Sequence, residues 1–388
     1  MAGQIEVSAV IPCLNEERTL AQCIEKAQRC LASLGVSGQV VVADNGSTDR
    51  STEIALQLGA KVVQQPLKGY GAALMAGFEA ADGELMVMAD GDGSYDWEAI
   101  GPFIAKLREG YDLVLGNRYK GGIMRGAMPP LHRYLGNPVL SFLGRTVSRT
   151  PIGDFHCGMR ALTKSAYRSM RLRTLGMEFA TEMVVAAAKQ GLRITEVPIV
   201  LYPDARDRPP HLRSFRDGWR HLRFIMTCAP DYVYAAPGAL LLLAGALLQV
   251  LLVAGPATVL GFKLGIHFLA LGCLLTLVGM NILFLGMLAK LAIAQMYPNL
   301  VSRTARWLLD RFKLEWGLVG GVVLIFAGTA IDFAILVRWV GTAGGPLEET
   351  IHAAFVATTV IVIGIGIVFG AFLLNLFLLA DRERAARR

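Results

Sequence analysis

The chain has 388 residues, of which 54% are hydrophobic and 18% are charged, and its mean hydropathy is +0.46. Because an ordinary soluble domain has roughly 25% charged residues, this composition excludes a disordered chain and disfavours a purely soluble protein. The formal net charge of +7 is typical of proteins that meet membrane surfaces or phosphate groups. The length suggests about two or three domains.

The charged residues are unevenly distributed along the chain. The 158 residues from Asp231 onward contain 19 of them, whereas the first 230 residues contain 50. We therefore expect an ordinary folded domain over residues 1–230 and a membrane domain over residues 231–388.

The N-terminal domain alternates strand-like and helix-like segments. Its apolar runs, each bounded by turn residues, are Val7–Ile11, Val40–Ala43, Lys61–Gln64, Glu84–Ala89 and Asp112–Leu115. Helix-like patterns lie between them, at Glu17–Leu34, Asp49–Leu58, Gly71–Ala81 and Trp97–Glu109. Continuous apolar strands that alternate with helices predict an α/β fold with a mostly parallel sheet flanked by helices. Ligands bind beyond the carboxyl ends of the strands in such a sheet.

Polar motifs follow three of these strands. The first strand ends in PCLNE (12–16), the second in DNGSTD (44–49), and the fourth is followed by DGDGSYD (90–96). In the last motif Asp90 and Asp92 stand one residue apart, and the neighbouring glycines allow a ligand to come close. This pattern predicts a hard-cation site, because Mg²⁺ or Mn²⁺ takes one or two protein carboxylates and completes its shell with phosphate and water.

The ordered set P-x-x-NE, DNGSTD, DGDGSYD and GNR (116–118) resembles the inverting family 2 glycosyltransferases, which have a GT-A nucleotide-sugar-binding domain. Within that family it is similar to the membrane-bound branch that loads sugars onto polyprenyl phosphate, such as dolichyl-phosphate mannose synthase. The resemblance covers residues 5–225. It implies a metal-dependent hexosyltransferase that moves a hexose from a UDP- or GDP-linked sugar to undecaprenyl or dolichyl phosphate with inversion, using Mg²⁺ or Mn²⁺.

The resemblance also implies roles for individual residues. The pocket for the base and ribose of the nucleotide would be lined by Pro12, Asn15, Glu16, Asp44 and Asp49. Asp90 and Asp92 would be catalytic metal ligands. Ser94 stands where many relatives carry glutamine, and it would be a weaker metal ligand, directly or through water. The remaining residues with implied roles are the catalytic Arg118 and Asp154, and Arg160 and Glu182 on the acceptor side.

Three basic segments are candidates for binding anionic groups. Lys68 and Gly69 precede a predicted helix, where backbone amides favour an anion, although an ordinary loop–helix junction has the same pattern. Arg133 and Arg213 lie in stretches, near 130–149 and 213–228, that we expect to form interfacial amphipathic helices. Each arginine either holds the lipid phosphate or extends toward anionic headgroups.

Four apolar stretches are long enough to cross a bilayer core, which needs about 20 residues. They run over residues 237–255, 264–289, 317–340 and 351–380. The last has no charged residue in 30 positions, which is rare for a helix of a soluble protein. We therefore expect an all-α membrane domain of four transmembrane helices.

Lysine and arginine are concentrated in the loop between the second and third spans and in the C-terminal tail. They are Arg303, Arg306, Arg311 and Lys313 in the loop, and Arg382, Arg384, Arg387 and Arg388 in the tail. Because basic loops stay in the cytoplasm, an even number of spans places the catalytic domain and both termini there. The expected location is a bacterial inner membrane or its equivalent.

The remaining composition narrows the partners. None of the six cysteines forms a CxxC pair, so we expect reduced thiols and no zinc site. The basic charge lies beside the spans and no nucleic-acid-binding motif accompanies it, so we expect a membrane partner and no nucleic acid. The sequence leaves a homo-oligomer open.

Other functions compete with polyprenyl-phosphate glycosylation. A processive polysaccharide synthase is disfavoured, because Arg303 and Ile335 stand where its QxxRW motif needs glutamine. A different lipid acceptor such as diacylglycerol stays open, with Asp154 or Asp96 as the general base that a hydroxyl requires. A transporter or flippase with a non-catalytic nucleotide-sugar-like domain is the alternative from another class, and the intact Asp90 and Asp92 argue against it.

Overall fold

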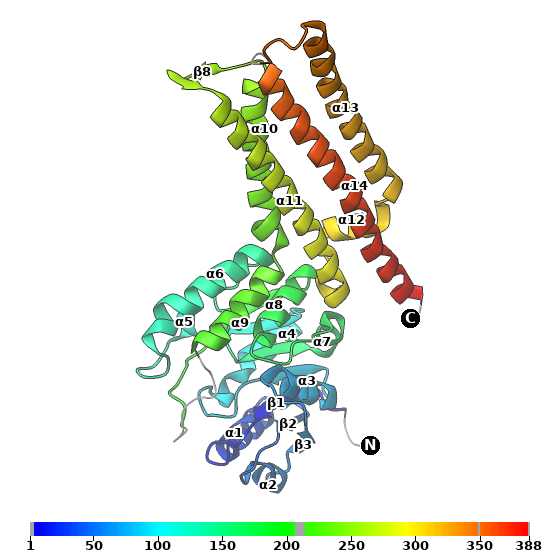
Figure 1. The fold of residues 1–388 in the computed structure, drawn as a ribbon. Coiled ribbons are helices and arrows are strands. Elements are labelled where there is room, and N and C mark those ends of the chain that lie inside the picture. The colour runs from blue at the N-terminus through cyan, green and yellow to red at the C-terminus, as the bar shows by residue number, and fades with distance from the viewer. Residues whose placement is uncertain (1–3, 206–213, 348–349, 387–388) are drawn as a thin grey trace. The chain divides into compact units, whose positions relative to one another are not determined.

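The computed structural model describes residues 4–205, 214–347 and 350–386. The chain divides into two compact units, Met1–Cys228 and Ala229–Arg388 (Figure 1). Each unit has its own elements and is described by itself below.

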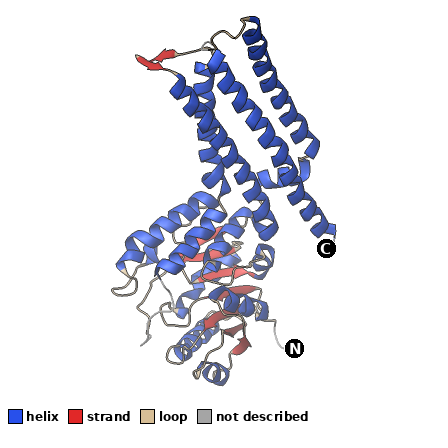
Figure 2. Cartoon of the chain, in the orientation of Figure 1, coloured by secondary structure: helices blue, strands red, loops and turns tan. Residues whose placement is uncertain are grey.

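The N-terminal unit is built around a seven-stranded mixed sheet with the order β3-β2-β1-β4-β6-β5-β7 (Figure 2). Its strands are β1 (Val7–Cys13), β2 (Gly38–Asp44), β3 (Lys61–Gln64), β4 (Leu85–Met88), β5 (Leu113–Asn117), β6 (Arg160–Thr163) and β7 (Ile194–Pro198). Only β6 runs antiparallel to its neighbours β4 and β5. The predicted mostly parallel sheet flanked by helices is therefore confirmed, while β6 and β7 were not predicted.

The first helix of this unit buries a single apolar face. In α1 (Leu20–Ser33) the residues Leu20, Cys23, Ile24, Ala27 and Leu31 recur at helical spacing, and all are buried against the sheet. The other helical elements are α2 (Ser51–Gln57), α3 (Tyr70–Ala80), η1 (Trp97–Ile100), α4 (Gly101–Arg108), α5 (Arg118–Gly121), η2 (His132–Gly136), α6 (Asn137–Ser148), α7 (Lys164–Met170), α8 (Phe179–Lys189) and α9 (Ser214–Thr227).

Two neighbouring helices, α6 and α9, carry exposed apolar side chains. On η2 and α6 these include Tyr134 and Phe142, and on α9 they include Phe215 and Trp219. Each helix is amphipathic, and an exposed apolar face flanked by basic residues is typical of helices that lie at a membrane surface.

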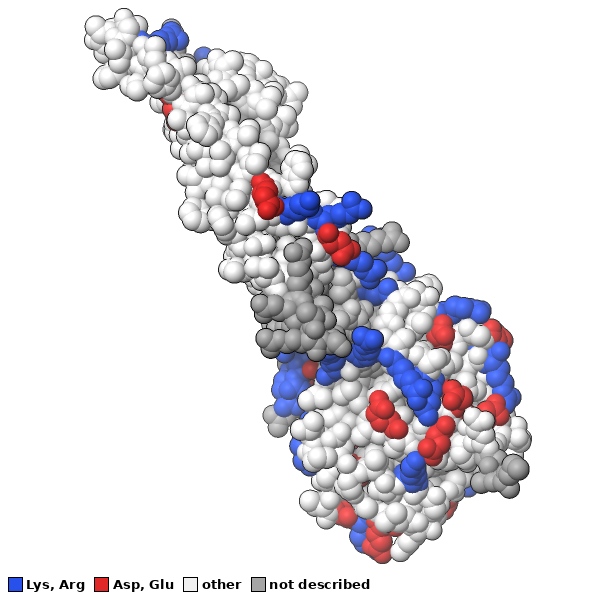
Figure 3. Space-filling model, turned by 90° about the vertical axis from the view of Figure 1, so that its right-hand side faces the viewer, with Lys and Arg blue, Asp and Glu red and all other residues white. Residues whose placement is uncertain are grey.

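Among its described residues, the second unit contains four helices that are long and apolar enough to cross a membrane. These spans are Asp231–Leu252, formed by η3 (Asp231–Ala235) and α10 (Ala236–Leu252), α11 (Ile266–Met296), α13 (Leu314–Gly341) and Ile351–Leu379 of α14 (Ile351–Ala386). Shorter elements also occur, namely η4 (Pro298–Leu300), α12 (Arg303–Arg311) and a hairpin of β8 (Ala257–Val259) and β9 (Phe262–Leu264). The predicted helical membrane domain with four candidate spans is confirmed, and the short hairpin between α10 and α11 was not predicted. Figure 3 shows that charged side chains are sparse along these helices.

Helices α10 and α11 approach closely because glycines line their contact. A Cβ atom added to Gly245 would lie 2.5 Å from the carbonyl oxygen of Gly272 and from the amide nitrogen of Thr276. Beside this contact the Gln249 amide donates to Thr276 Oγ at 2.6 Å, and both side chains are buried. Small residues and interhelical hydrogen bonds are the usual means of helix association in membranes.

We predict that Gly245→Ala lowers the thermal stability of the detergent-solubilised protein. Alanine favours a helix by about 1 kcal/mol over glycine, but overpacking at this contact costs about 1–3 kcal/mol. Gly366→Ala on α14 is the matched control, because no atom lies within 4 Å of the added Cβ. Equal melting temperatures for the two variants would contradict close packing at Gly245.

Candidate active site

Two adjoining cavities of about 460 and 400 Å³ lie in the N-terminal unit. The first cavity is lined by the loops that follow β1, β2 and β3, including Pro12, Glu16, Asn45, Lys68 and Gly69. The second cavity is lined by a different set of side chains, including Ser94, Tyr95, Arg118, His132, Asn137, His156 and His221. The residues that line both cavities form what we call the shared wall, namely Tyr70, Asp90, Asp92, Met177, Asp204 and Asp217.

The loop after β4 places two carboxylates in this shared wall. Asp92 is 8% exposed, and its Oδ1 accepts hydrogen bonds from the Ser94 amide at 2.9 Å and the Ser94 hydroxyl at 2.6 Å. A second hydrogen bond also holds this loop, because the Thr19 hydroxyl donates to the carbonyl oxygen of Gly91 at 2.7 Å. Ser94 therefore orients the carboxylate of Asp92.

The donor set at this wall fits a hard divalent cation that shares its shell with a ligand. Within the described ranges no group of three or more His, Cys, Asp or Glu side chains forms a complete metal site. Asp90 and Asp92 supply carboxylate oxygens, and Mg²⁺ commonly takes one or two carboxylates together with substrate phosphates and water. These two residues would hold the ion, and the remaining positions would be left to a phosphate ligand.

Some residues of the motif after β1 line the first cavity, and Asn15 stabilises the loop. Pro12 and Glu16 line the first cavity. Asn15 has a left-handed backbone (φ 58°), and its side-chain oxygen accepts from the amide of Thr48 at 2.6 Å. Asn15 thus ties the loop after β1 to the loop after β2.

The two aspartates after β2, Asp44 and Asp49, accept hydrogen bonds from backbone amides of the same loop. The carboxylate of Asp44 is 2% exposed and accepts from the amides of Gly46 and Ser47. Asp49 accepts from the amides of Glu17 and Ser51, at 3.1 and 3.0 Å. Burial raises the pKa of Asp49, but the hydrogen bonds from Ser51 and Glu17 outweigh it and keep the pKa below its usual value. Neither carboxylate lines the two cavities, which differs from the expected contact with the nucleotide.

Lys68 and Gly69 both line the first cavity. The Lys68 ammonium donates to the carbonyl oxygens of Asn45, at 2.7 Å, and Gly46, at 3.3 Å. The amide of Gly69 donates to the side-chain oxygen of Asn45 at 2.7 Å, and its φ of 145° lies in a region that favours glycine. A positive charge is therefore held at this end of the first cavity.

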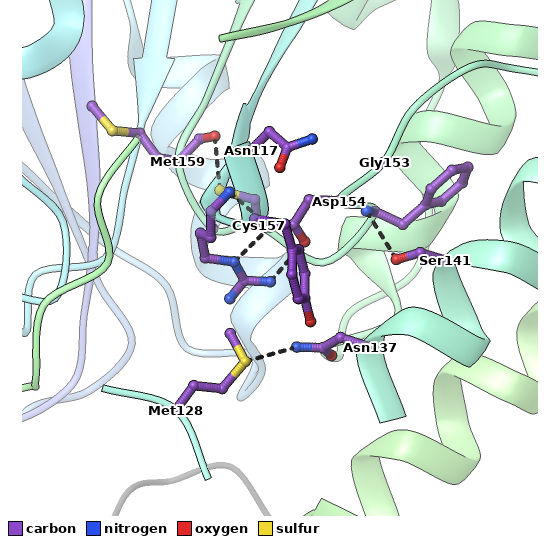
Figure 4. A network of polar contacts seen from close by, with 12 residues as sticks. Asn117, Met128, Asn137, Ser141, Gly153, Asp154, Cys157 and Met159 are labelled. Atoms are coloured by element: carbon purple, nitrogen blue, oxygen red, sulfur yellow. Dashed lines mark hydrogen bonds and ion pairs between the residues drawn. The ribbon is translucent and has the colours of Figure 1, made fainter. Parts of the chain in front are cut away.

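A buried ion pair positions Arg118 in the second cavity. Arg118 follows β5, and its guanidinium makes two hydrogen bonds to Asp154, at 2.7 and 2.8 Å. Asp154 has no exposed surface and Arg118 is 7% exposed. Burial lowers the pKa of Arg118, but Tyr95 and Asp154 outweigh it and raise the pKa well above its ordinary value. Figure 4 shows Asp154 within the surrounding polar network, near Asn117 and Ser141.

This geometry makes Asp154 a positioning residue. Both of its oxygens accept from Arg118, and it does not line either cavity. Further along the same segment, a Cβ added to Gly158 would lie 2.6 Å from Oδ2 of Asp90. The segment from Asp154 to Arg160 therefore passes directly behind the shared wall, and a side chain at position 158 would displace Asp90.

Arg160 and Glu182 lie inside the protein, contrary to the expected contact with the acceptor. The fully buried guanidinium of Arg160 donates to the carbonyl oxygens of Phe155, Cys157 and Ala180 at 2.6–2.9 Å. The fully buried carboxylate of Glu182 accepts from the amides of Arg173 and Thr174. Neither side chain lines the two cavities. Both hold loop backbone that lies near the site.

The predicted lipid-phosphate arginines lie apart from the cavities or outside the described chain. Arg133 is half-buried in η2, where its guanidinium lies 5.5 Å from the ring centre of Tyr134, and it does not line either cavity. Arg213 falls outside the described residues.

Helix α9 adds site residues that the sequence did not single out. Arg216 and Arg220 line the first cavity and pair with Asp217, at 3.4 and 3.7 Å, and Asp217 lies in the shared wall. Asp217 is 2% exposed although it stands in a strongly basic segment. The sequence feature that could have indicated Asp217 is that it is a single acidic residue among arginines on an amphipathic helix.

The six cysteines are free and buried. Burial raises the pKa of Cys13 to about 11 and the pKa of Cys23 to about 12. The raised pKa values of Cys13 and Cys23 favour the protonated thiols at neutral pH, which are poor nucleophiles.

Comparison with known proteins identifies the class. Residues 8–171 match the description "Glycosyl transferase family 2", and residues 287–378 match "Glycosyltransferase family 2 C-terminal transmembrane region". The chain is 38% identical over 370 residues to the low-salt glycan biosynthesis hexosyltransferase Agl6 of Haloferax volcanii, covering 95% of this chain and 88% of that protein. The chain therefore belongs to glycosyltransferase family 2.

Two further relatives carry lipid phosphates in their names. The dolichyl-phosphate hexose transferase of Haloferax volcanii is 32% identical over 196 residues, covering 50% of this chain and 82% of that protein. The undecaprenyl-phosphate 4-deoxy-4-formamido-L-arabinose transferase of Salmonella paratyphi B is 26% identical over 314 residues, covering 77% of this chain and 91% of that protein. The protein is accordingly a membrane-integral glycosyltransferase with a GT-A-like catalytic domain.

We predict that Asp154→Asn strongly destabilises the N-terminal unit. Removing one partner of a buried ion pair leaves an uncompensated charge and costs about 3–5 kcal/mol. Asp82→Asn is the control, because it breaks a pair with Lys61 in which both side chains are well exposed. Thermal melting of the two variants measures the difference, and a melting temperature for Asp154→Asn as high as that of the control would contradict this assignment.

Proposed function

We propose that the protein transfers a hexose from a nucleotide-sugar to polyprenyl phosphate at the cytoplasmic face of the membrane. The observation that carries the proposal is the wall containing Asp90 and Asp92, which has cationic residues in the cavity on each side. Two cavities that meet at a cation site suit a reaction between two anionic substrates. The lipid-phosphate names of two relatives support the acceptor class.

The nucleoside diphosphate of the donor would occupy the first cavity, with the sugar directed past Asp90 and Asp92 into the second. Pro12 and Glu16 line the first cavity after β1, and Glu16 has a carboxylate that can accept from ribose hydroxyls or base amines. Lys68, Arg216 and Arg220 bring positive charge to the same cavity, where a diphosphate is attracted. When bound at Asp90 and Asp92, Mg²⁺ or Mn²⁺ supplies Lewis acidity to the leaving diphosphate.

The acceptor phosphate would enter the second cavity and meet Arg118. The pair with Asp154 fixes the guanidinium in place, so no reorganisation is needed when the phosphate binds. A phosphate monoester has a second pKa near 6 and is mostly dianionic at neutral pH, so it attacks without a general base.

The reaction is then one displacement at the anomeric carbon. A bond forms between this carbon and an oxygen of the acceptor phosphate, and the bond to the diphosphate oxygen breaks. The electron pair of the broken bond leaves with the nucleoside diphosphate. In-line attack inverts the configuration, so an α-linked donor gives a β-linked product.

The two substrates would meet at the membrane surface. The tail of a polyprenyl phosphate stays in the bilayer, whereas a nucleotide-sugar is soluble in water. The exposed apolar residues of α6 and α9 belong at the surface where these two substrates meet. The basic loop between α11 and α13 favours a cytoplasmic location for the N-terminal unit.

An acceptor with a hydroxyl group, such as diacylglycerol, fits less well. It requires a general base within reach of the hydroxyl. Asp154 has both oxygens on Arg118, and Asp96 accepts from the Lys26 ammonium at 3.2 Å. Neither lines the two cavities. A transporter without catalysis would have no need for the two carboxylates in the shared wall.

The proposal is tested with the full-length protein in detergent or native membranes. Labelled nucleotide-sugars are added one at a time with undecaprenyl phosphate and Mg²⁺ or Mn²⁺, and label in the organic phase is counted. We expect one donor to give label that depends on both the added lipid phosphate and the metal. Label that forms with diacylglycerol instead, or nucleotide-sugar binding without any transfer, would contradict the proposal.

We predict that Asp92→Asn lowers the transfer rate at least about 100-fold, because the leaving diphosphate loses its electrostatic stabilisation. The matched control is Glu98→Gln, which removes an exposed carboxylate paired with Arg29 and lying outside both cavities. The control should retain the wild-type rate. A near-normal rate for Asp92→Asn in the same assay would rule out this residue as a metal ligand.

A further inference from the structure

Two histidines from distant segments lie together in the second cavity. His156 belongs to the loop before β6 and His221 to α9, and both line this cavity beside Arg118, Asp90 and Asp92. Their rings are 4.5 Å apart between centres and nearly perpendicular, at 79°. The mechanism proposed above uses neither of them.

The hydroxyl of Thr181, on α8, bridges the two rings. Thr181 Oγ lies 2.8 Å from Nδ1 of His221 and 3.4 Å from Nε2 of His156, and Thr181 is fully buried. Nδ1 of His156 is also buried, and it has no hydrogen-bond partner among the residues that the structure describes. Burying a polar atom without a partner is unfavourable, and a ligand group that hydrogen-bonds to Nδ1 of His156 would remove this cost.

Both imidazoles are neutral at physiological pH. Burial lowers the pKa of His156 well below its usual value, and His221, Arg118 and Arg160 lower it further. Burial also lowers the pKa of His221 to about 4, although Asp217 acts in the opposite direction. A neutral imidazole has one donor and one acceptor nitrogen. It therefore matches a hydroxyl group better than a phosphate, which accepts only.

The bridge couples the tautomers of the two rings. Thr181 has one hydroxyl proton, so it donates to one ring and accepts from the other. When it donates to His221, Nε2 of His221 carries a proton and Nδ1 of His156 is left as an acceptor. The reverse arrangement exchanges the two roles. In either case the two nitrogens that do not contact Thr181, Nδ1 of His156 and Nε2 of His221, comprise one donor and one acceptor.

We propose that His156 and His221 hydrogen-bond hydroxyl groups of the sugar that is transferred, and thereby determine which hexose is accepted. This inference rests on the proposed function, which places the anomeric carbon between the diphosphate at Asp90 and Asp92 and the acceptor phosphate at Arg118. The sugar ring then lies in the second cavity, which these histidines line. Thr181 is a positioning residue that couples the tautomers of the two rings.

The inference is tested by binding, which does not require transfer. The full-length protein in detergent with Mn²⁺ is titrated with a nucleoside diphosphate, with nucleotide-hexoses, and with deoxy analogues that each lack one sugar hydroxyl. The preference for a hexose over its deoxy analogue is the ratio of the two dissociation constants. Transfer to lipid phosphate is assayed separately, so failure of the proposed function is recorded independently of this ratio.

We expect His156→Ala and Thr181→Val each to reduce this preference at least about tenfold for one hydroxyl, because a site that hydrogen-bonds a hydroxyl rejects analogues lacking it. Affinity for the nucleoside diphosphate should not change, which shows that the variants are folded. His156→Gln, which keeps a neutral donor and acceptor, should restore part of the preference. His267→Ala removes an exposed imidazole of α11 that lines neither cavity and should leave the preference unchanged. An unchanged preference in both His156→Ala and Thr181→Val, with intact binding of the diphosphate, would overturn the inference.

Discussion

Repulsion between negative charges is the constraint on which this site depends. The loop after β4 puts Asp90 and Asp92 into a wall between two cavities, and both proposed substrates bring further negative charge to that wall. A nucleoside diphosphate and a lipid phosphate approach each other only if cations offset them. The fold supplies Lys68, Arg216 and Arg220 on one side and Arg118 on the other, and the proposed divalent cation would lie between them.

The buried side chains around the site serve this arrangement. Asp154 fixes Arg118, Glu182 fixes the loop at Arg173 and Thr174, and Arg160 holds the carbonyl groups of the segment behind Asp90. These groups were the acidic and basic candidates for direct contact with substrate. Within the D-x-x-x-G-x-R segment, Asp154 bonds to Arg118 and Arg160 bonds to carbonyl groups near Gly158, which lies next to Asp90. Preorganisation of this kind lowers the reorganisation needed when charged ligands bind.

The sequence predicted the features that depend on local pattern. Apolar runs located β1 to β5, and hydrophobic length located the four spans. The motifs singled out Asp90, Asp92 and Arg118, which line the second cavity. It did not predict β6, a four-residue strand whose place depends on non-local antiparallel pairing. Nor did it distinguish Glu182, which points inward, from Asp217 and His221, which line the cavity, because the face that a helix presents is set by tertiary packing.

The central claim is that the protein supplies only part of a cation site and the nucleotide completes it. Titration of Mn²⁺ followed by electron paramagnetic resonance, with and without a nucleoside diphosphate, tests this directly on the full-length protein. The account predicts weak binding of Mn²⁺ alone, much tighter binding with the diphosphate, and loss of that gain in Asp92→Asn. Equally tight Mn²⁺ binding without the diphosphate, or diphosphate binding that is indifferent to the metal, would contradict it.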